Sequence, residues 1–185
     1  MRDDYKILKK ITLKNGKELI LRKPVEQDCK EIIGFLNTVG GESDNLLYGE
    51  NGFTFTVEDE KKYIDSINND ENCLMILGII DDRIISISNI SSLNGKRFKH
   101  NSSFGIAVKK EFWRMGIGSI AMSELIKFAR ENKVIQNISL GVKADNYGAI
   151  KLYENHGFKK VGVHKNYFNV GGKYFDEVLM DLYLS

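Results

Sequence analysis

The sequence predicts an α+β (mixed α/β) fold, in which a central mixed and mostly antiparallel sheet carries about four helices on its faces. The first observation behind this prediction is the order of the strand and helix patterns, which reads β-β-α-α-β-β-β-α-β-α-β-β. The second is that 185 residues with 42% apolar side chains suffice for one hydrophobic core. The third is that only one proline is present and no Pro-rich or Ser-rich linker divides the chain. We therefore expect residues 1–185 to form a single domain.

Two strand patterns near the start of the chain predict a β-hairpin. They are Ile7–Leu13 and Lys17–Arg22, and they flank Asn15-Gly16. This dipeptide favours tight hairpin turns because both of its residues tolerate positive φ angles. The hairpin, residues 6–22, could be an element added to the rest of the domain.

Two helices and a loop are expected next. Apolar residues recur at helical spacing in Val25–Leu36, and Gly40-Gly41 should end that helix. The stretch Glu42–Phe55 is polar and aperiodic, which is typical of a loop. Thr56 then resembles the first residue of a capping box, and the helix that it begins should run to about Asn68.

The second half of the chain alternates strands and helices. Apolar runs bounded by turn residues predict the strands Cys73–Ile80, Arg83–Leu93, Ser102–Val108, Ile138–Val142, Lys159–Phe168 and Lys173–Leu184. The turns between strands fall at Asp81-Asp82, Asn94-Gly95 and Gly171-Gly172. Helical spacing predicts helices over Gly116–Glu131 and Tyr147–Asn155, and Gly157 suits the end of the second.

Composition excludes several classes of protein. The net charge is +2 and no long basic run occurs, so we expect no nucleic-acid partner. The longest apolar run, Leu74–Ile80, is too short to span a membrane, and no apolar stretch follows the first residues, so we expect a cytoplasmic protein without a membrane partner. Cys29 and Cys73 form no disulfide or zinc pattern, and the histidines lack metal-ligand spacing, so we expect no metal.

The first chemical signal is a glycine-rich turn between a strand and a helix. The strand Ile106–Val108 is followed, after a short linker, by Trp113 and by Arg114–Ser119, which contains Gly116 and Gly118. Glycines let the backbone approach a ligand closely, and the start of a helix offers unpaired N–H groups and a positive dipole end. Together they predict a site for a pyrophosphate group.

A dinucleotide site is the alternative reading of this turn. Gly116–Ala121 matches the G-x-G-x-x-A fingerprint, and Tyr147 and Lys151 match a Y-x-x-x-K pattern, so an NAD(P)-dependent oxidoreductase must be weighed. That fingerprint requires an acidic residue at the end of the next strand, where this chain has Lys143. It should also open the first βαβ unit, whereas here about 100 residues of mostly antiparallel pattern precede the glycines. We therefore favour the first reading.

A second motif makes the resemblance specific. Residues Asn146–Phe158 read NYGAIKLYENHGF, which resembles the N-x-x-A-x-x-L-Y-x-x-x-G-F pattern of the GNAT superfamily of N-acetyltransferases. The glycine turn resembles that superfamily's pyrophosphate loop, usually [QR]-x-x-G-x-[GA]. Trp113 stands where Gln or Arg is usual, so the side chain that braces the loop is in question. The resemblance runs from about Leu19 to Leu184. It implies acetyl-CoA as co-substrate and a central sheet with a splayed strand pair.

The resemblance also implies roles for individual residues. The strand backbone would bind the pantetheine arm, the loop amides would bind the pyrophosphate, and two residues of the last helix would contact the arm and the sulfur. These cofactor-binding positions are Ile106, Ala107, Val108, Arg114, Met115, Gly116, Ile117, Gly118, Ser119, Asn146 and Tyr153. Asn146 could instead act only as a helix cap, and Tyr153 could be an ordinary core residue.

The expected reaction is direct attack of a primary amine on the acetyl thioester, with Tyr153 as the general acid. The general base is less defined, because the strand Ser102–Val108 carries no glutamate. Glu42 and Asp44, in the loop that lines the acceptor side in this superfamily, are the candidates, and Glu50 and His100 follow. These acids could equally attract a cationic amine.

The acceptor is a small-molecule amine or a protein or peptide amine, and the sequence does not decide between them. A non-catalytic acyl-CoA-binding module on the same fold is a further alternative. The oligomeric state stays open, a homodimer included.

Overall fold

The computed structural model describes residues 6–93 and 95–184, and within them the predicted order of strands and helices is confirmed. The first five residues and Asn94 of the predicted Asn94-Gly95 turn lie outside that part. The strands are β1 (Ile7–Thr12), β2 (Glu18–Arg22), β3 (Leu74–Ile80), β4 (Arg83–Ser92), β5 (Asn101–Val108), β6 (Asn137–Lys143), β7 (Lys159–Val170) and β8 (Lys173–Tyr183). The helices are α1 (Cys29–Glu42), α2 (Val57–Asn68), α3 (Ile117–Glu131) and α4 (Tyr147–Asn155), with the 3₁₀ turns η1 (Glu26–Asp28) and η2 (Lys110–Phe112).

These strands form one mixed sheet in the order β1-β2-β3-β4-β5-β6-β8-β7. Every neighbouring pair is antiparallel except β5 and β6, which are joined through α3 by a crossover. The chain returns through α4 to β7 at the edge, and β8 inserts between β6 and β7. The fold is therefore the predicted α+β arrangement with mostly antiparallel pairing.

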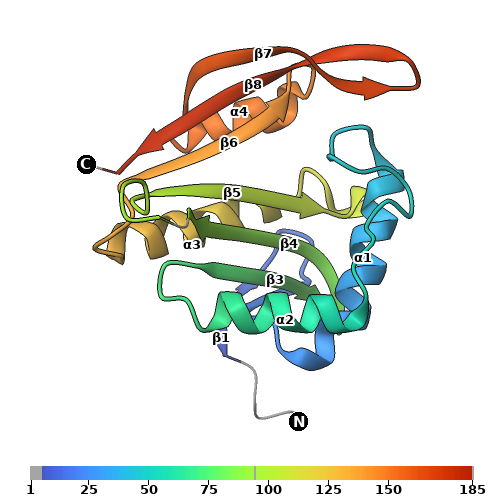
Figure 1. Cartoon of the computed structure of the whole chain (residues 1–185). Helices are drawn as coiled ribbons and strands as arrows, with labels where there is room; N and C mark the ends of the chain where they lie inside the picture. Colours follow the sequence, from blue (N-terminus) through green and yellow to red (C-terminus); the bar gives the residue numbers. More distant parts are fainter. Residues whose placement is uncertain (1–5, 94, 185) are drawn as a thin grey trace.

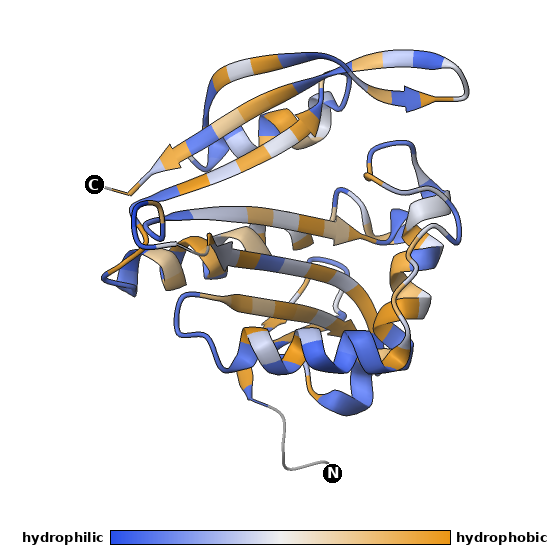
Figure 2. Ribbon diagram, in the orientation of Figure 1, coloured by the Kyte–Doolittle hydropathy of each residue, from blue (hydrophilic) through white to orange (hydrophobic). Residues whose placement is uncertain are grey.

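Helices cover the two faces of the sheet in pairs (Figure 1). On one face α1 and α2 bury Ile32, Phe35 and Ile64 against β3 and β4. On the other face α3 and α4 pack on a larger core that also takes in β6 and β8. Buried β3 is apolar throughout, whereas β8 contains both polar and apolar residues (Figure 2), as expected for a strand with one covered face.

The parallel pair β5–β6 is joined only at one end. Cα pairing runs from Asn101–Asn137 to Ser103–Ser139 and then stops. Beyond it β6 stays paired with β8 to Lys143, and β5 stays paired with β4 to Val108. The two strands diverge from that point (Figure 1), so the expected splayed pair is present.

The first helix differs from the prediction. Gly40-Gly41 does not end it, since α1 continues to Glu42. The buried stripe Ile32, Phe35 and Val39 keeps its helical spacing up to the glycine pair, and Gly40 is itself buried, so packing of this face outweighs the low propensity of glycine. Gly40 is needed because the following loop packs on the helix: an added Cβ would clash with the carbonyl oxygen of Gly49 and lie 3.1 Å from Cδ2 of Tyr48.

Candidate active site

The loop before α3 has the backbone of an anion site. Gly116 is the N-cap residue of α3 with a φ of 83°, a left-handed conformation that glycine adopts without strain. Arg114 also has a positive φ, of 62°. No side chain caps the first amides of α3, and an added Cβ at Gly116 would have no neighbour within 4 Å. The helix start is thus open, with its N–H groups available to a phosphate oxygen.

Gly118 has a different reason to be glycine. An added Cβ there would lie 3.3 Å from Cδ2 of Leu152 and 3.7 Å from Cδ1 of Ile106. The residue therefore lets the first turn of α3 pack closely on α4 and on β5. This close packing holds the predicted loop, the predicted strand and the second motif against one another.

Trp113 braces the loop. Its indole Nε1 donates a hydrogen bond of 2.7 Å to the carbonyl oxygen of Val108, the last residue of β5. The bond ties the glycine turn back to the end of the strand. A side chain with a donor, in the position where Gln or Arg is usual, can therefore hold the loop in this chain. The sequence pattern did not indicate that the partner of the Trp113 side chain would be the carbonyl oxygen of Val108.

His156 makes a second tie that the sequence analysis missed. Its Nδ1 lies 2.9 Å from the carbonyl oxygen of Leu152, and its Nε2 lies 3.2 Å from Oγ of Ser119. A carbonyl only accepts, so Nδ1 carries the hydrogen and Nε2 accepts from the serine hydroxyl. The end of α4 is thereby fixed to the start of α3. No metal or catalytic spacing marked this histidine in the sequence.

The free edge of β5 lies beside the loop. Ile106 and Val108 pack toward the core of α3 and α4, whereas Ala107 packs toward the core of α1 and α2. Because pairing with β6 stops at Ser103, the β6-side backbone groups from Phe104 to Val108 have no strand partner in the described chain. Such an edge can pair with an extended ligand in the manner of strand addition.

Tyr153 lies in α4 on the α3 and α4 face of the sheet, 7% exposed. Its ring contacts Phe104 of β5 edge-on, with centroids 6.0 Å apart, and Phe158 at 5.9 Å. Burial raises the pKa of Tyr153 to about 12, so the phenol keeps its proton at neutral pH. The ring therefore stands next to β5, just beyond the end of the β5–β6 pairing.

Asn146 is the N-cap of α4. Its side-chain oxygen accepts a hydrogen bond of 3.2 Å from the amide of Ala149. Capping uses the oxygen of the amide and leaves its NH₂ group to other partners. The capping role that the sequence left open is thus present, and it does not compete with a ligand contact through nitrogen.

The structure separates the candidates for a general base. Glu42 ends α1, and its Oε2 accepts a hydrogen bond of 2.7 Å from the amide of Lys110, two residues after the end of β5. Asp44 and Glu50 are exposed in the loop that follows. His100 instead precedes Asn101, at the paired end of β5 and β6, so it is placed away from the open end.

Other site classes find little support in the described ranges 6–93 and 95–184. No group of three or more His, Cys, Asp or Glu there could hold a metal ion. No helix in these ranges has the length and hydropathy that a membrane span needs. One parallel strand pair does not make the doubly wound sheet that the dinucleotide fingerprint requires.

Relatives of known class match the chain. A sequence model of the acetyltransferase (GNAT) family matches residues 43–158. L-amino acid N-acetyltransferase AaaT of Escherichia coli (strain K12) is 30% identical over 105 residues, which are 57% of this chain and 65% of that protein. Ribosomal protein bS18-alanine N-acetyltransferase of Salmonella typhimurium is 34% identical over 82 residues, 44% of this chain and 55% of that protein. The chain thus matches less than two thirds of either relative's length.

A third relative and two solved structures match over most of the chain. An N-alpha-acetyltransferase of Saccharolobus solfataricus is 30% identical over 84% of this chain and 89% of its own. A GNAT-family acetyltransferase from Streptococcus pneumoniae superposes with a TM-score of 0.87 at 27% identity, covering 90% of this chain and 99% of that one. The yncA protein of Salmonella typhimurium, solved with acetyl-CoA, shares the fold with a TM-score of 0.79 at 15% identity, over 90% and 94%.

The match of the family model to residues 43–158 covers more than half of the sequence, and it includes both motifs and the open strand pair. The resemblance seen in the motifs is confirmed, and the chain belongs to the acetyltransferase (GNAT) family.

Proposed function

We propose that this chain is an acetyl-CoA-dependent N-acetyltransferase that acts by direct attack of a primary amine on the thioester. The observation that carries the proposal is the divergence of β5 from β6 beside an uncapped, glycine-opened helix start. Names of the relatives support the reaction class, since they acetylate amino acids, the alanine of a ribosomal protein, or α-amino groups.

The residues present fit coenzyme A as a substrate. The unpaired edge of β5, at Ile106, Ala107 and Val108, offers backbone donors and acceptors to the two amides of the pantetheine arm. The amides from Arg114 to Ser119 would bind the pyrophosphate, and the NH₂ of Asn146 would contact the arm. Bound there, acetyl-CoA supplies an activated acetyl group.

Tyr153 is proposed as the general acid. Its buried phenol is protonated at neutral pH and lies beside Phe104 of the open strand. A thiol ordinarily titrates near 8.5, below the pKa of about 12 of this phenol. The tyrosine therefore acts mainly by donating a strong hydrogen bond to the developing thiolate, and the proton follows as the sulfur leaves.

Glu42 and Asp44 remain candidates for the general base, and they could equally attract the cationic acceptor amine. Glu42 is fixed next to the end of β5 through the amide of Lys110, and Asp44 is exposed two residues later. An ammonium group is attracted by such carboxylates. The acceptor is proposed to be an amino acid or a peptide or protein N-terminus, by the chemistry of the relatives.

Two measurements test the proposed function. Acetyl-CoA should bind in calorimetry and raise the melting temperature, whereas NAD should do neither. Release of free thiol should then accelerate with at least one of three classes of amine: amino acids, N-terminal peptides and polyamines. Binding of acetyl-CoA without thiol release from any amine would identify a non-catalytic acyl-CoA module instead.

A further inference from the structure

The carboxylate of Glu177 lies over the backbone of the neighbouring strand. Glu177 belongs to β8 and is 7% exposed. An added Cβ at Gly141 of β6 would lie 2.6 Å from Cδ of Glu177 and would also clash with its Oε1. Only a residue without a side chain leaves room for the carboxylate at this place. Gly141 therefore gives the carboxylate its position above β6.

His164 holds one oxygen of this carboxylate. The two residues are direct partners across β7 and β8, and Nδ1 of His164 lies 2.9 Å from Oε2 of Glu177. An ionised carboxylate only accepts, so Nδ1 carries the hydrogen and donates it. The imidazole also stacks on Tyr167, with centroids 5.4 Å apart. Within the described chain, Oε1 of Glu177 has no hydrogen-bond donor, and it is the oxygen nearest Gly141.

This carboxylate lies level with the open part of the splayed pair. The last paired residue of β6 is Ser139, and Gly141 follows two positions later. The β6 residues Ile138, Leu140 and Val142 pack in the core under α3 and α4, so Gly141 faces the other side of the sheet. Toward the paired end of the strands, a pocket of about 450 Å³ is lined by residues that include Ser103, Ser139 and Gly141 but not Glu177.

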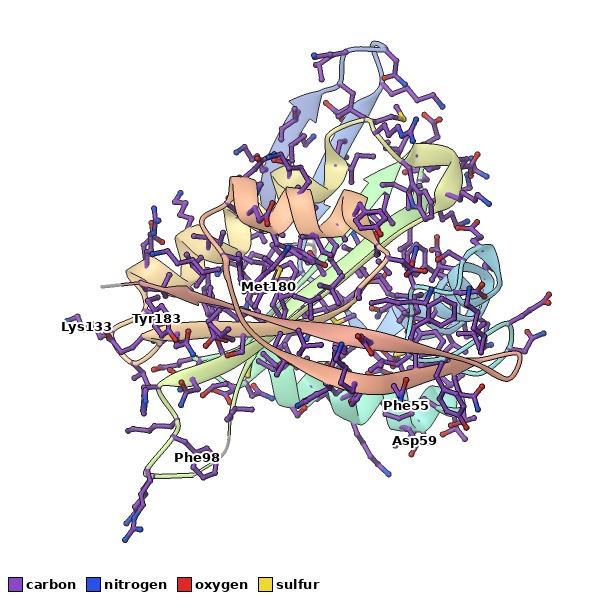
Figure 3. The ribbon with its side chains drawn as sticks, turned by 90° about the horizontal axis from the view of Figure 1, so that it is seen from above. Phe55, Asp59, Phe98, Lys133, Met180 and Tyr183 are labelled. Carbon is purple, nitrogen blue, oxygen red and sulfur yellow. The ribbon has the colours of Figure 1, made fainter. Side chains whose placement is uncertain are left out.

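Tyr153 and Glu177 lie on opposite faces of the open strands. Tyr153 belongs to the core of α3 and α4, whereas Glu177 shares with Gly141 the face that α1 and α2 cover elsewhere. The tip of the β7–β8 hairpin and the loop before α2, which includes Phe55, lie at the same end of the molecule in both views (Figures 1 and 3). Tyr183 lies at the other end, where β5 and β6 are paired.

We propose that Glu177 is the general base for the acceptor amine and that His164 is a positioning residue that holds its carboxylate. The inference rests on the acetyltransferase function proposed above. An amine reaches the site as an ammonium, which has no free lone pair. Oε1 of Glu177 takes one proton, and the lone pair set free forms the C–N bond as the C–S bond breaks. That proton passes to solvent. Tyr153 gives its proton to the leaving sulfur, and the second proton lost by the nitrogen restores the phenol through solvent.

Charged neighbours leave Glu177 free for this role. Lys143 is its cross-strand partner on β6, but its ammonium is held 2.8 Å from both oxygens of Asp145 and 3.6 Å over the ring of Phe175. The lysine is therefore neutralised by another carboxylate. The negative charge of Glu177 is shared only with the half-exposed imidazole of His164 in the described hydrogen bonds.

Asp181 provides a matched control. It lies on the same strand and the same face as Glu177, four residues further along. Its β6 partner is Ser139, where β5 and β6 are still hydrogen-bonded, so it is not level with the open part. Asp181→Asn and Glu177→Gln each remove one carboxylate from the same face with little change in shape.

The kinetic experiment measures thiol release from acetyl-CoA with L-alanine, the tripeptide Ala-Gly-Gly and spermidine. Glu177→Gln should lower kcat roughly 10²-fold or more and leave the KM for acetyl-CoA within about twofold. Asp181→Asn should stay within about threefold of the parent. His164→Ala should lower kcat, and His164→Asn should restore part of the loss because its amide nitrogen can replace Nδ1. Equal losses for Glu177→Gln and Asp181→Asn, or wild-type turnover by Glu177→Gln, would overturn the proposal.

A second experiment needs no acceptor. The chain has three histidines, whose ring signals can be followed by NMR. Coenzyme A and acetyl-CoA should both shift His156, which contacts Ser119, and neither should shift His100 at the paired end. The ring signals of His164 should shift with acetyl-CoA but not with coenzyme A, because His164 contacts Glu177 and only acetyl-CoA carries the acetyl group that lies near this carboxylate. A His164 signal that is the same with both ligands rejects Glu177 as the base, even if no amine is turned over. If neither coenzyme A nor acetyl-CoA binds, the acetyltransferase function itself is rejected.

Discussion

At the scale of single residues, one indole nitrogen and one phenol carry most of what distinguishes this site. Trp113 occupies a position where Gln or Arg is usual in this family, yet its Nε1 donates a hydrogen bond of 2.7 Å to the carbonyl oxygen of Val108. Tyr153 is held among Phe104 and Phe158 with its proton retained. Each residue can be tested by substitution with phenylalanine, which removes the hydrogen-bond donor and keeps an aromatic ring.

Tyr153→Phe should lower kcat roughly 10²-fold, because the leaving thiolate loses its hydrogen-bond donor. The dissociation constant of acetyl-CoA should change little, since the ring packing is kept. Steady-state thiol release and calorimetry measure the two quantities. Tyr147→Phe, at a 75% exposed position of the same helix, is the control and should behave as the parent. Undiminished turnover by Tyr153→Phe would reject its role as acid.

Trp113→Phe should weaken acetyl-CoA binding about fivefold, because the loop loses a hydrogen bond worth about 1 kcal/mol. The phenyl ring keeps the packing but has no donor for the Val108 carbonyl. Calorimetric titration with acetyl-CoA measures the change. An unaltered dissociation constant would show that the loop keeps its shape without the indole bond.

At the scale of elements, glycines serve three different purposes. Gly116 supplies a left-handed backbone before α3, Gly118 allows α3 to approach α4, and Gly141 leaves space for a side chain of β8. Gly40 lies inside α1, where the pattern of the sequence predicted an end. At Gly40 the packing of the following loop outweighs the low helix propensity of glycine, and α1 ends two residues later.

Gly116→Ala should destabilise the protein by about 1–2 kcal/mol, because a side chain is strained at a φ of 83°. Gly148→Ala is its control within α4, where an added Cβ meets nothing within 4 Å and φ is not positive. That change should instead stabilise by about 0.4–1 kcal/mol. Urea unfolding of both variants measures the difference, and a loss of stability in both would contradict the account of Gly116.

Sequence patterns predicted the elements well because periodicity and turn residues are local signals. The capping box at Thr56 and Asp59 is present as expected, and so is the hairpin turn before β2. The end of α1 was wrong because it depends on how the loop at Tyr48 packs. The contacts of Trp113 with Val108 and of Glu177 with Gly141 could not be predicted, since the first needs the shape of a loop and the second needs the register of β6 against β8.

At the scale of the whole molecule, the two faces of the sheet carry separate cores that differ in their polar content. The core under α1 and α2 encloses Glu60, which is 1% exposed. Both of its carboxylate oxygens lack a hydrogen-bond partner in the described chain. Burial raises the pKa of Glu60 to about 7, and it also raises that of Tyr48 to about 12, with the charge of Glu60 as a second cause.

Stability should therefore fall as the pH rises toward 8. The folded state binds the Glu60 proton more tightly than the unfolded chain, because folding raises the pKa from 4.5 to about 7. This contribution is complete below pH 4.5 and is lost as the pH passes 7, at most about 3 kcal/mol. Glu60→Gln should remove the slope in urea unfolding between pH 5 and about 8. Glu58→Gln, exposed in the same turn, should keep it, and an equal slope in both variants would exclude Glu60 as its source.

The short pairing of β5 with β6 also concerns how the molecule holds together. In the described chain, the backbone hydrogen bonds between the two halves of the sheet lie at one end, between residues 100–103 and 136–139, and the rest of that boundary depends on side chains packed beneath it. An extended molecule with its own amides, lying along the free edge of β5, would complete the missing rungs of the ladder. The acyl donor would then be a structural member of the sheet as well as a reagent, and each turnover would remove and replace a part of the fold.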